Sequence, residues 1–270
     1  MSSMNSRMVR TGRDVEVNVL EAGVTSTPAM FFLHGVLGLL RDTTLLDLLA
    51  QHFHVFAPEL PGYGVSKGEE RLEDMLDFTL HGLDVLHALE LQNPIVVGHS
   101  LGGMIAAEMA CLTPDAIDKL VLIDPFGIWI DDCPIPDLFS LLPFEFGELF
   151  FHDSDRAAQL LPGASDLADP ESLRQFVIDS TRQLGTAGKL LFPIPNRRLS
   201  KRLYRLRTPT LLAWGENDRL MPAEPYSARW HALLPHANAL TLPQAGHMLP
   251  YEQPDRLAEE IIKFCVTPSG

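Results

Sequence analysis

The most constraining feature of the sequence is an alternation of short apolar runs with longer stretches of helical periodicity. The apolar runs are β-branched or aromatic and end at glycine, proline or polar turns, as buried strands do. They cover residues 29–33, 53–56, 95–97, 120–123, 210–214 and 240–242. The helical stretches cover residues 42–52, 72–91, 101–112, 223–234 and 255–264. This order predicts an α/β fold with a parallel sheet between helices, to which residues 15–20 add an antiparallel edge strand.

The alternation stops between residues 125 and 207, where prolines and short helical pieces replace strands. We therefore expect a core domain of residues 1–124 and 208–270 and a helical cap, or lid, of residues 125–207. Residues 131–155 include seven acidic side chains and no Lys or Arg, whereas residues 189–207 include seven Lys and Arg side chains and no acidic ones. These two segments are expected to form solvated faces that attract each other, and the alternative is a charged rim that selects ionic substrates.

The overall charge of the chain restricts the class of partner. Its 270 residues are 46% hydrophobic and carry a formal net charge of −14. The composition is that of a folded globular domain, and the negative charge repels phosphate backbones, so no nucleic acid partner is expected. No apolar run has the length of a signal peptide or a spanning helix, which predicts a cytoplasmic protein without membrane insertion.

The sequence lacks the common motifs that bind metal ions or the phosphates of a cofactor. The three cysteines are widely spaced and form neither a disulfide framework nor a CxxC metal site. There is no GxxxxGK[ST] phosphate loop and no HExxH pair, so we expect no cofactor and no metal. The partners that remain are a small-molecule substrate and water, and the sequence does not indicate an oligomeric state.

Ser100 lies at the centre of a GxSxG pattern between the predicted strand 95–97 and the predicted helix 101–112. At a sharp turn of this kind the serine backbone is strained, and the glycines on either side let the strand and helix approach closely. The hydroxyl then lies at the positive end of the helix dipole, where developing negative charge is stabilised. This setting predicts that Ser100 is a nucleophile.

A serine hydroxyl needs a base in order to attack, and the base needs a third group to orient it. His247 is the candidate base because it lies in a loop after a strand, where open α/β sheets build their sites. Asp218 is the favoured acid, and Asp124 and Glu216 are its alternatives. The order Ser, Asp, His along the chain matches the nucleophile-elbow scheme.

In that scheme an oxyanion hole combines the amide after the nucleophile with an amide from the loop after an earlier strand. Leu101 supplies the first amide. Val36, in the turn His34-Gly35-Val36 after the predicted strand 29–33, is expected to supply the second. His34 is expected to brace this loop by hydrogen bonding.

Several landmarks, in this order along the chain, resemble the α/β-hydrolase fold superfamily, in the subgroup with a helical cap. They are His34-Gly35-Val36, residues 59–66 (ELPGYGVS), the Ser100 elbow, residues 214–218 (WGEND), and Gly246-His247 followed by Glu252-Gln253-Pro254. The resemblance implies an eight-stranded, mostly parallel sheet flanked by helices, with the cap inserted after the sixth strand. It also implies a triad of Ser100, Asp218 and His247.

The serine nucleophile separates this chain from the epoxide hydrolases and haloalkane dehalogenases of the superfamily, which use aspartate. We expect a carboxylesterase-like serine hydrolase that cleaves an ester or lactone of a small to medium, partly apolar substrate through an acyl-enzyme. Residues 138–144, with Phe146, Phe150 and Phe151, either line an acyl pocket or pack the cap onto the core.

Two other functions remain open at this point. Carbon–carbon bond hydrolases that act on vinylogous diketones share the serine triad, but Met248 stands where they usually carry tryptophan. A non-catalytic ligand receptor on the same fold is the alternative from another class.

Overall fold

A sheet of eight strands forms the centre of the computed structural model, which describes residues 4–142, 145–163, 166–193 and 195–267. The strands are β1 (Asn5–Arg10), β2 (Glu16–Ala22), β3 (Ala29–Leu33), β4 (His54–Pro58), β5 (Ile95–His99), β6 (Lys119–Ile123), β7 (Thr210–Gly215) and β8 (Asn238–Leu242). Their order in the sheet is β1-β2-β4-β3-β5-β6-β7-β8. β2 pairs antiparallel with β1 and β4, and the other pairs are parallel. The predicted mostly parallel sheet is confirmed, and residues 15–20 are antiparallel as predicted, but the prediction that they form the edge is wrong because β1 pairs with the outer side of β2.

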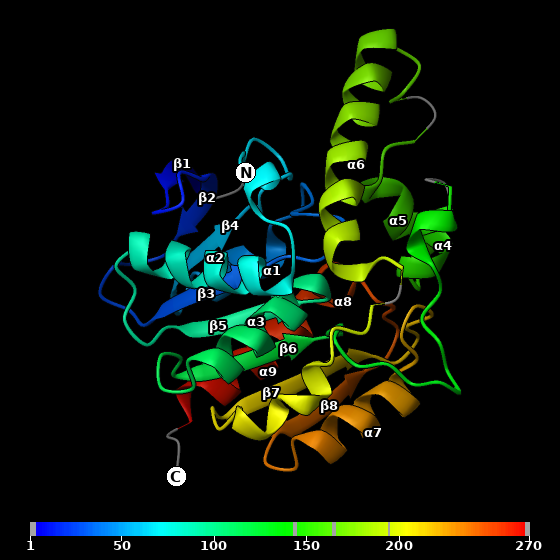
Figure 1. The fold of residues 1–270 in the computed structure, drawn as a ribbon. Helices are drawn as coiled ribbons and strands as arrows, with labels where there is room; N and C mark the ends of the chain where they lie inside the picture. Colours follow the sequence, from blue (N-terminus) through cyan, green and yellow to red (C-terminus); the bar gives the residue numbers. More distant parts are fainter. Residues whose placement is uncertain (1–3, 143–144, 164–165, 194, 268–270) are drawn as a thin grey trace.

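Helices cover both faces of this sheet (Figure 1). They are α1 (Thr44–Leu49), α2 (Met75–Ala88) preceded by the 3₁₀ turn η1 (Glu69–Arg71), α3 (Leu101–Leu112), α7 (Ala223–Leu233), α8 (Leu249–Glu252) and α9 (Pro254–Val266). Because successive strand side chains point to opposite faces, Phe31 and Leu33 pack with α2 and α3, whereas Met30 and Phe32 pack with α1 and α9. This is the predicted layered α/β architecture.

Between β6 and β7 the described residues form helices and no strand. These are η2 (Leu138–Ser140), α4 (Phe146–Phe150), α5 (Ser154–Leu160), α6 (Pro170–Leu191), η4 (Leu199–Lys201) and η5 (Leu203–Arg205). The predicted helical insertion after the sixth strand is therefore confirmed, while the division of the chain into two domains stays a prediction. The N-terminal half of α6 projects beyond the rest of the molecule (Figure 1).

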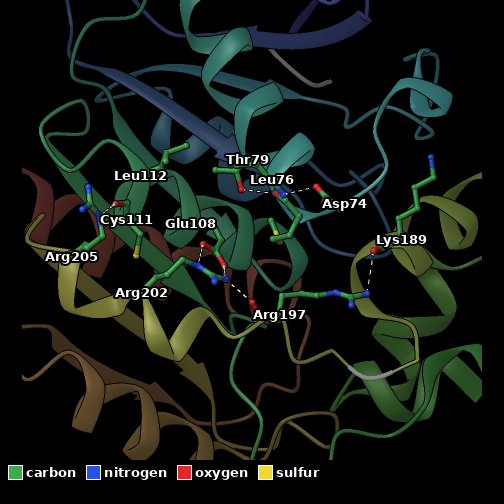
Figure 2. Close-up of a pocket in the computed structure, with 11 residues that line it drawn as sticks. Asp74, Leu76, Thr79, Glu108, Cys111, Leu112, Lys189, Arg197, Arg202 and Arg205 are labelled. Atoms are coloured by element: carbon green, nitrogen blue, oxygen red, sulfur yellow. Dashed lines mark hydrogen bonds and ion pairs between the residues drawn. The ribbon is translucent and has the colours of Figure 1, made fainter.

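Basic side chains at the end of the insertion hold it to the core (Figure 2). Arg202 binds both carboxylate oxygens of the buried Glu108 on α3, and Arg205 donates to the carbonyl oxygen of Cys111 at 2.7 Å. Lys189 on α6 donates to the carbonyl oxygen of Leu72 at 2.7 Å. In the described part of the chain no ion pair joins residues 131–155 to residues 189–207. The expected attraction between the two segments therefore stays a prediction.

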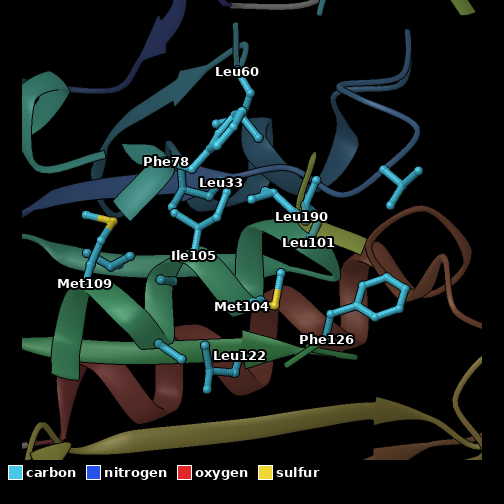
Figure 3. Close-up of a cluster of buried hydrophobic side chains, with 14 of the residues drawn as sticks. Leu33, Leu60, Phe78, Leu101, Met104, Ile105, Met109, Leu122, Phe126 and Leu190 are labelled. Atoms are coloured by element: carbon cyan, nitrogen blue, oxygen red, sulfur yellow. The ribbon is translucent and has the colours of Figure 1, made fainter. Parts of the chain in front are cut away.

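The core on the α3 side of the sheet reaches into the insertion. Leu190 of α6 belongs to the same buried cluster as Leu33, Leu101, Met104 and Phe126 (Figure 3). Nearly every residue of α3 is buried, since this helix lies between the sheet and the insertion. The first turn of α3 is therefore held rigidly.

Among the described residues, no helix is both long and apolar enough to cross a membrane. Cys111, Cys133 and Cys265 are free thiols.

Candidate active site

The carboxyl ends of five parallel strands bring the residues selected from the sequence to one edge of the sheet. His34 follows β3, Ser100 follows β5, Asp124 follows β6, Asp218 follows β7 and His247 follows β8. Ligands and reactive groups of open α/β sheets gather at this edge. Residues far apart in the sequence therefore converge there.

Ser100 forms a strained turn between β5 and α3. Its φ of 56° and ψ of −117° lie in a region that a residue other than glycine rarely occupies, at a cost of about 1–3 kcal/mol. The Ser100 amide donates to the carbonyl oxygen of Ile123 at 2.8 Å, and the Phe126 amide donates to the Ser100 carbonyl oxygen at 3.1 Å. These two bonds fix the turn to the end of β6.

Glycines are required around Ser100 because the backbone packs very closely. A Cβ atom on Gly98 would lie 2.5 Å from the carbonyl oxygen of Gly102, and one on Gly102 would lie 2.2 Å from that of Leu33. Real Cβ contacts are not this short, so neither position accepts a side chain. The prediction that these glycines let the strand and helix approach is confirmed.

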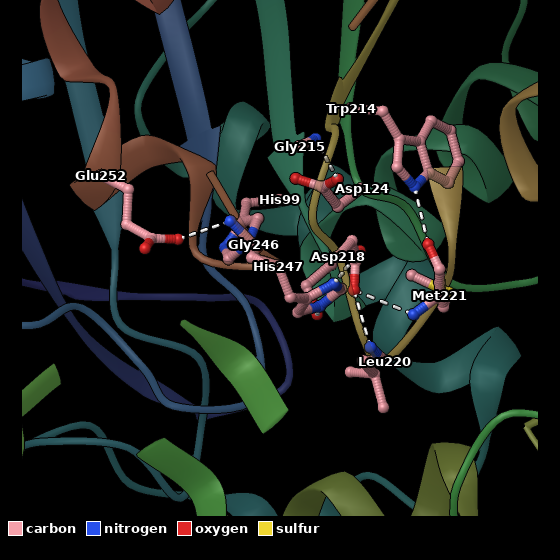
Figure 4. Close-up of polar contacts among 11 residues, drawn as sticks. His99, Asp124, Trp214, Gly215, Asp218, Leu220, Met221, Gly246, His247 and Glu252 are labelled. Carbon is pink, nitrogen blue, oxygen red and sulfur yellow. Dashed lines mark hydrogen bonds and ion pairs between the residues drawn. The ribbon is translucent and has the colours of Figure 1, made fainter. Parts of the chain in front are cut away.

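Three buried side chains form a continuous line of hydrogen bonds. His247 Nε2 lies 2.7 Å from Ser100 Oγ, and His247 Nδ1 lies 2.8 Å from Asp218 Oδ2. Asp218 Oδ1 accepts the amides of Leu220 at 2.8 Å and Met221 at 2.9 Å (Figure 4). Because an ionised carboxylate only accepts, Nδ1 carries the proton and the lone pair on Nε2 faces the serine hydroxyl.

The three candidate acids differ in their contacts with His247. Asp218 contacts His247, whereas Asp124 accepts the Gly215 amide at 2.9 Å and Glu216 is exposed to solvent. Burial, followed by the charge of Asp218, holds the pKa of Asp124 well above its usual range. The geometry thus favours Asp218 over Asp124 and Glu216, and its role as the catalytic acid stays a prediction.

Ligand atoms of Asp124, Asp218 and His247 lie within 4.8 Å of one another, which is close enough to hold a metal ion. His247 Nδ1, however, carries a proton that is directed at Asp218 Oδ2, so this nitrogen has no lone pair for a metal. The arrangement therefore suits proton transfer better than metal binding.

His34 holds the loop that follows β3. Its Nε2 accepts the Leu60 amide at 2.9 Å, so its Nδ1 carries the proton and donates to the Gly35 carbonyl oxygen at 2.8 Å. Burial lowers the pKa of His34 to about 4, which keeps the ring neutral. The predicted bracing role of His34 agrees with these bonds.

The braced loop lies directly against the serine. A Cβ atom on Gly35 would lie 2.9 Å from the Cβ atom of Ser100. Within the described residues, neither the Val36 amide nor the Leu101 amide donates a hydrogen bond. Both amides are therefore free to bind an oxygen, while their role as an oxyanion hole stays a prediction.

Two positioning contacts were not identified from the sequence. His99 Nε2 donates to the carbonyl oxygen of His247 at 2.7 Å, and burial lowers the pKa of His99 to about 3. Glu252 accepts the Gly246 amide at 2.7 Å and the amides of His152 and Asp153 at 2.8 Å. His99 neighbours Ser100 and Glu252 lies in a landmark of the resemblance, but neither position alone indicates these bonds.

Aromatic side chains close the site. The ring centroids of Phe126 and Phe150 lie 5.8 and 5.4 Å from that of His247, and the Phe150 carbonyl oxygen accepts the Met248 amide at 3.0 Å. Ser100 and His247 have no exposed surface. The insertion thus shields the site from water.

The apolar run of the insertion serves mainly to pack it onto the core. Leu138, Phe146, Phe150 and Phe151 belong to the buried cluster, and Leu142 is exposed. Leu138 and Phe139 also line a small cavity of about 40 Å³ beside Phe126. Residues 143 and 144 lie outside the described residues.

Known proteins resemble the chain in sequence and in fold. It is 27% identical over 230 residues to a pimeloyl-[acyl-carrier protein] methyl ester esterase of Pectobacterium carotovorum, covering 82% of this chain and 87% of the esterase. Carboxylesterase CesB of Bacillus subtilis superposes with a TM-score of 0.74 at 21% identity, covering 99% of this chain and 93% of CesB. A meta-cleavage product hydrolase of Pseudomonas fluorescens superposes with a TM-score of 0.76 at 19% identity, covering 96% of this chain and 97% of that hydrolase.

The family model described as the alpha/beta hydrolase family matches residues 30–260. This span runs from β3 to α9 and includes the loops that carry His34, Ser100, Asp218 and His247. The chain therefore belongs to the alpha/beta hydrolase family.

Proposed function

We propose that this hydrolase cleaves a carboxylic ester or lactone through an acyl-enzyme on Ser100. The observation that carries the proposal is the unbroken line from Ser100 Oγ through His247 to Asp218, with heavy-atom distances of 2.7 and 2.8 Å. A hydroxyl, a base with its lone pair on that hydroxyl, and an acid that orients the base are the parts that acyl transfer requires.

In the acylation step, His247 Nε2 takes the proton of Ser100 while Oγ attacks the carbonyl carbon. The carbonyl oxygen becomes an oxyanion, which the free amides of Val36 and Leu101 bind. Asp218 stabilises the imidazolium through its bond to Nδ1. The imidazolium then gives its proton to the departing alcohol, which leaves an acyl group on Ser100.

The deacylation step repeats this sequence with water. His247 takes a proton from a water molecule, whose oxygen attacks the acyl carbon while the same amides bind the oxyanion. The carbonyl then re-forms, the bond to Oγ breaks, and Ser100 recovers its proton from His247. The products are a carboxylic acid and the alcohol released earlier, or a hydroxy acid when the substrate is a lactone.

The surroundings of the serine support a small to medium, partly apolar substrate. Phe126, Phe150 and Met248 are buried next to His247, so the surroundings of the base are apolar. The esterase relative and the carboxylesterase of similar fold add support for an ester bond. The resemblance to CesB rests on fold alone.

A hydrolase for carbon–carbon bonds of vinylogous diketones is a second candidate. The observation in its favour is the fold shared with the meta-cleavage product hydrolase. Met248 counts against it, since this group usually carries tryptophan after its histidine. A non-catalytic ligand receptor is the remaining alternative.

A substrate panel tests the proposal. Purified protein and the Ser100→Ala variant are incubated with p-nitrophenyl esters of increasing acyl length, with lactones, and with a vinylogous diketone. Ester or lactone turnover that is lost in the variant supports the proposal. Turnover of the diketone alone supports the second candidate, and tight binding of a substrate without turnover supports the receptor.

A further inference from the structure

Asp124 is a fully buried carboxyl group that does not contact His247. Its backbone has a φ of 42°, and its amide donates to the carbonyl oxygen of Ala213 at 2.9 Å. Its Oδ1 accepts the Gly215 amide at 2.9 Å (Figure 4). Its Oδ2 has no hydrogen-bond donor among the described residues. A buried carboxylate with one donor is poorly stabilised.

Asp218 differs from Asp124 in the number of hydrogen bonds that it accepts. Its two oxygens take the amides of Leu220 and Met221 and the Nδ1 proton of His247. A carboxylate has about four lone-pair sites, so one of them remains open. A carboxyl oxygen of Asp124 lies within 4.8 Å of an oxygen of Asp218.

Two buried carboxyl groups at this separation do not both ionise, because like charges repel strongly where water is excluded. The single negative charge belongs to Asp218, which has three donors against one for Asp124. A proton on Asp124 Oδ2 turns this orphan acceptor into a donor, for which the neighbouring Asp218 has one open acceptor site.

We propose that Asp124 is a neutral carboxylic acid at neutral pH, with Oδ1 accepting the Gly215 amide and the Oδ2 hydroxyl donating to Asp218. Asp124 is then a positioning residue: it completes the donors around Asp218 and leaves one carboxylate to orient His247. The inference deepens the proposed function and rests on the role given there to Asp218.

The groups around Asp124 are consistent with this state. The charges that act on it come from Asp218 and, more weakly, from Glu252, and both raise the pKa of Asp124. The base His247 and the neutral rings of His99 and His34 are among the other titratable groups at this edge of the sheet, and Glu216 there is exposed to solvent. Among the described residues, no basic side chain lies close enough to lower the pKa of Asp124.

The test compares the wild-type protein with Asp124→Asn in equilibrium unfolding at several pH values. An amide has the shape of the neutral acid, because its oxygen accepts the Gly215 amide and its NH₂ donates to Asp218. Between about pH 5 and pH 6 Asp124 is ionised in the unfolded chain and keeps its proton in the folded protein. As the pH rises through this range, the folding equilibrium constant of the wild type is therefore expected to fall tenfold per pH unit relative to that of D124N.

Asp115→Asn is the matched control, because Asp115 is exposed and the same charge is removed at a site that water reaches in the folded protein. The ratio of the folding equilibrium constant of D115N to that of the wild type is expected to stay constant over this pH range. A constant ratio for D124N as well overturns the proposal, since it means that folded Asp124 is ionised. This measurement needs no catalytic activity, so its outcome is separate from that of the proposed function.

Carbon-13 NMR of wild-type protein labelled at its aspartate carboxyl carbons is the second measurement if D124N does not fold. One carboxyl carbon is expected to keep the chemical shift of the protonated acid at pH 7. If all of them have the shift of ionised carboxylates, the proposal is overturned.

Activity gives a further readout that a purely structural role does not predict. Asp124→Leu removes both the acceptor for Gly215 and the donor to Asp218, and we expect kcat/KM to fall at least tenfold. D124N is expected to have a kcat/KM much closer to that of the wild type than the leucine variant has. The acidic limb of its profile of kcat/KM against pH is expected to lie at the same pH as in the wild type. An acidic limb displaced to lower pH in D124N contradicts the proposal, because it means that a negative charge next to His247 has been removed.

Discussion

Ser100 Oγ lies 2.7 Å from His247 Nε2, although the two residues are 147 positions apart in the sequence. The contact exists because β5 and β8 end at the same edge of the sheet, and because His99 holds the carbonyl oxygen of His247 at 2.7 Å. The short distance is therefore a property of the whole fold.

Replacement of Asp218 by asparagine is predicted to lower kcat for an ester by about 10⁴-fold, since an amide favours the wrong histidine tautomer. Initial rates with a p-nitrophenyl ester check this. Glu216→Gln is the control, because Glu216 is exposed two residues away, and its rate should stay within about twofold of the wild type. Near-normal activity of D218N would show that another group orients His247.

Gly35→Ala is predicted to lower kcat at least 100-fold. The added Cβ would lie 2.9 Å from both His99 Nδ1 and Ser100 Cβ, so the loop that carries the Val36 amide has to move. A misplaced oxyanion donor costs about 10²–10³ in kcat. Gly185→Ala on α6 is the control, as its Cβ meets nothing within 4 Å. Equal activity of the two variants contradicts the placement of this loop.

Acid is predicted to destabilise the protein through its buried histidines. The pKa of His99 is lowered to about 3 in the folded state, so below about pH 6.5 the unfolded chain binds the extra proton. Stability is therefore lost as the pH falls, by up to about 1.4 kcal/mol per pH unit for this group. Urea unfolding of wild type and His99→Gln at several pH values checks the sign, because the glutamine variant lacks the contribution of His99 to this slope and keeps those of the buried His34 and His81.

His231→Gln is the matched control, since His231 lies exposed on α7. We expect it to retain the full slope of the wild type. If His99→Gln also retains the full wild-type slope, His99 is not neutral in the folded protein.

The central strands could be predicted because they are buried on both faces. β3, β5, β6 and β7 have almost no exposed residues and read as unbroken apolar runs. β1 could not be predicted, because Val9 is its one buried residue and its strand character comes from pairing with β2. An edge strand of this kind has no sequence pattern of its own.

The length of α6 also exceeded the prediction of short helical pieces. Its 22 residues bury side chains only at Thr186, Ala187, Leu190 and Leu191, near the C-terminal end. Helical periodicity is recognised from the stripe that faces a core, and most of α6 has no core to face.

The site residues were predictable to the extent that each has a local pattern. The pattern of Ser100 is the pair of flanking glycines, and that of His247 is its position in a loop after a strand. The choice between Asp218 and Asp124 has no such pattern, because it depends on distances of a few ångströms between neighbouring strand ends. The bond from His99 to His247 spans 148 positions and leaves no local pattern. Such contacts are visible only in the folded chain.

The most direct test of the central claim is ester turnover by the Ser100→Ala variant. The alanine removes one oxygen from a site that is otherwise unchanged, so far-UV circular dichroism should match the wild type. The account predicts that wild-type protein hydrolyses p-nitrophenyl acetate and that S100A releases p-nitrophenol no faster than buffer. Turnover by folded S100A at the wild-type rate would contradict it.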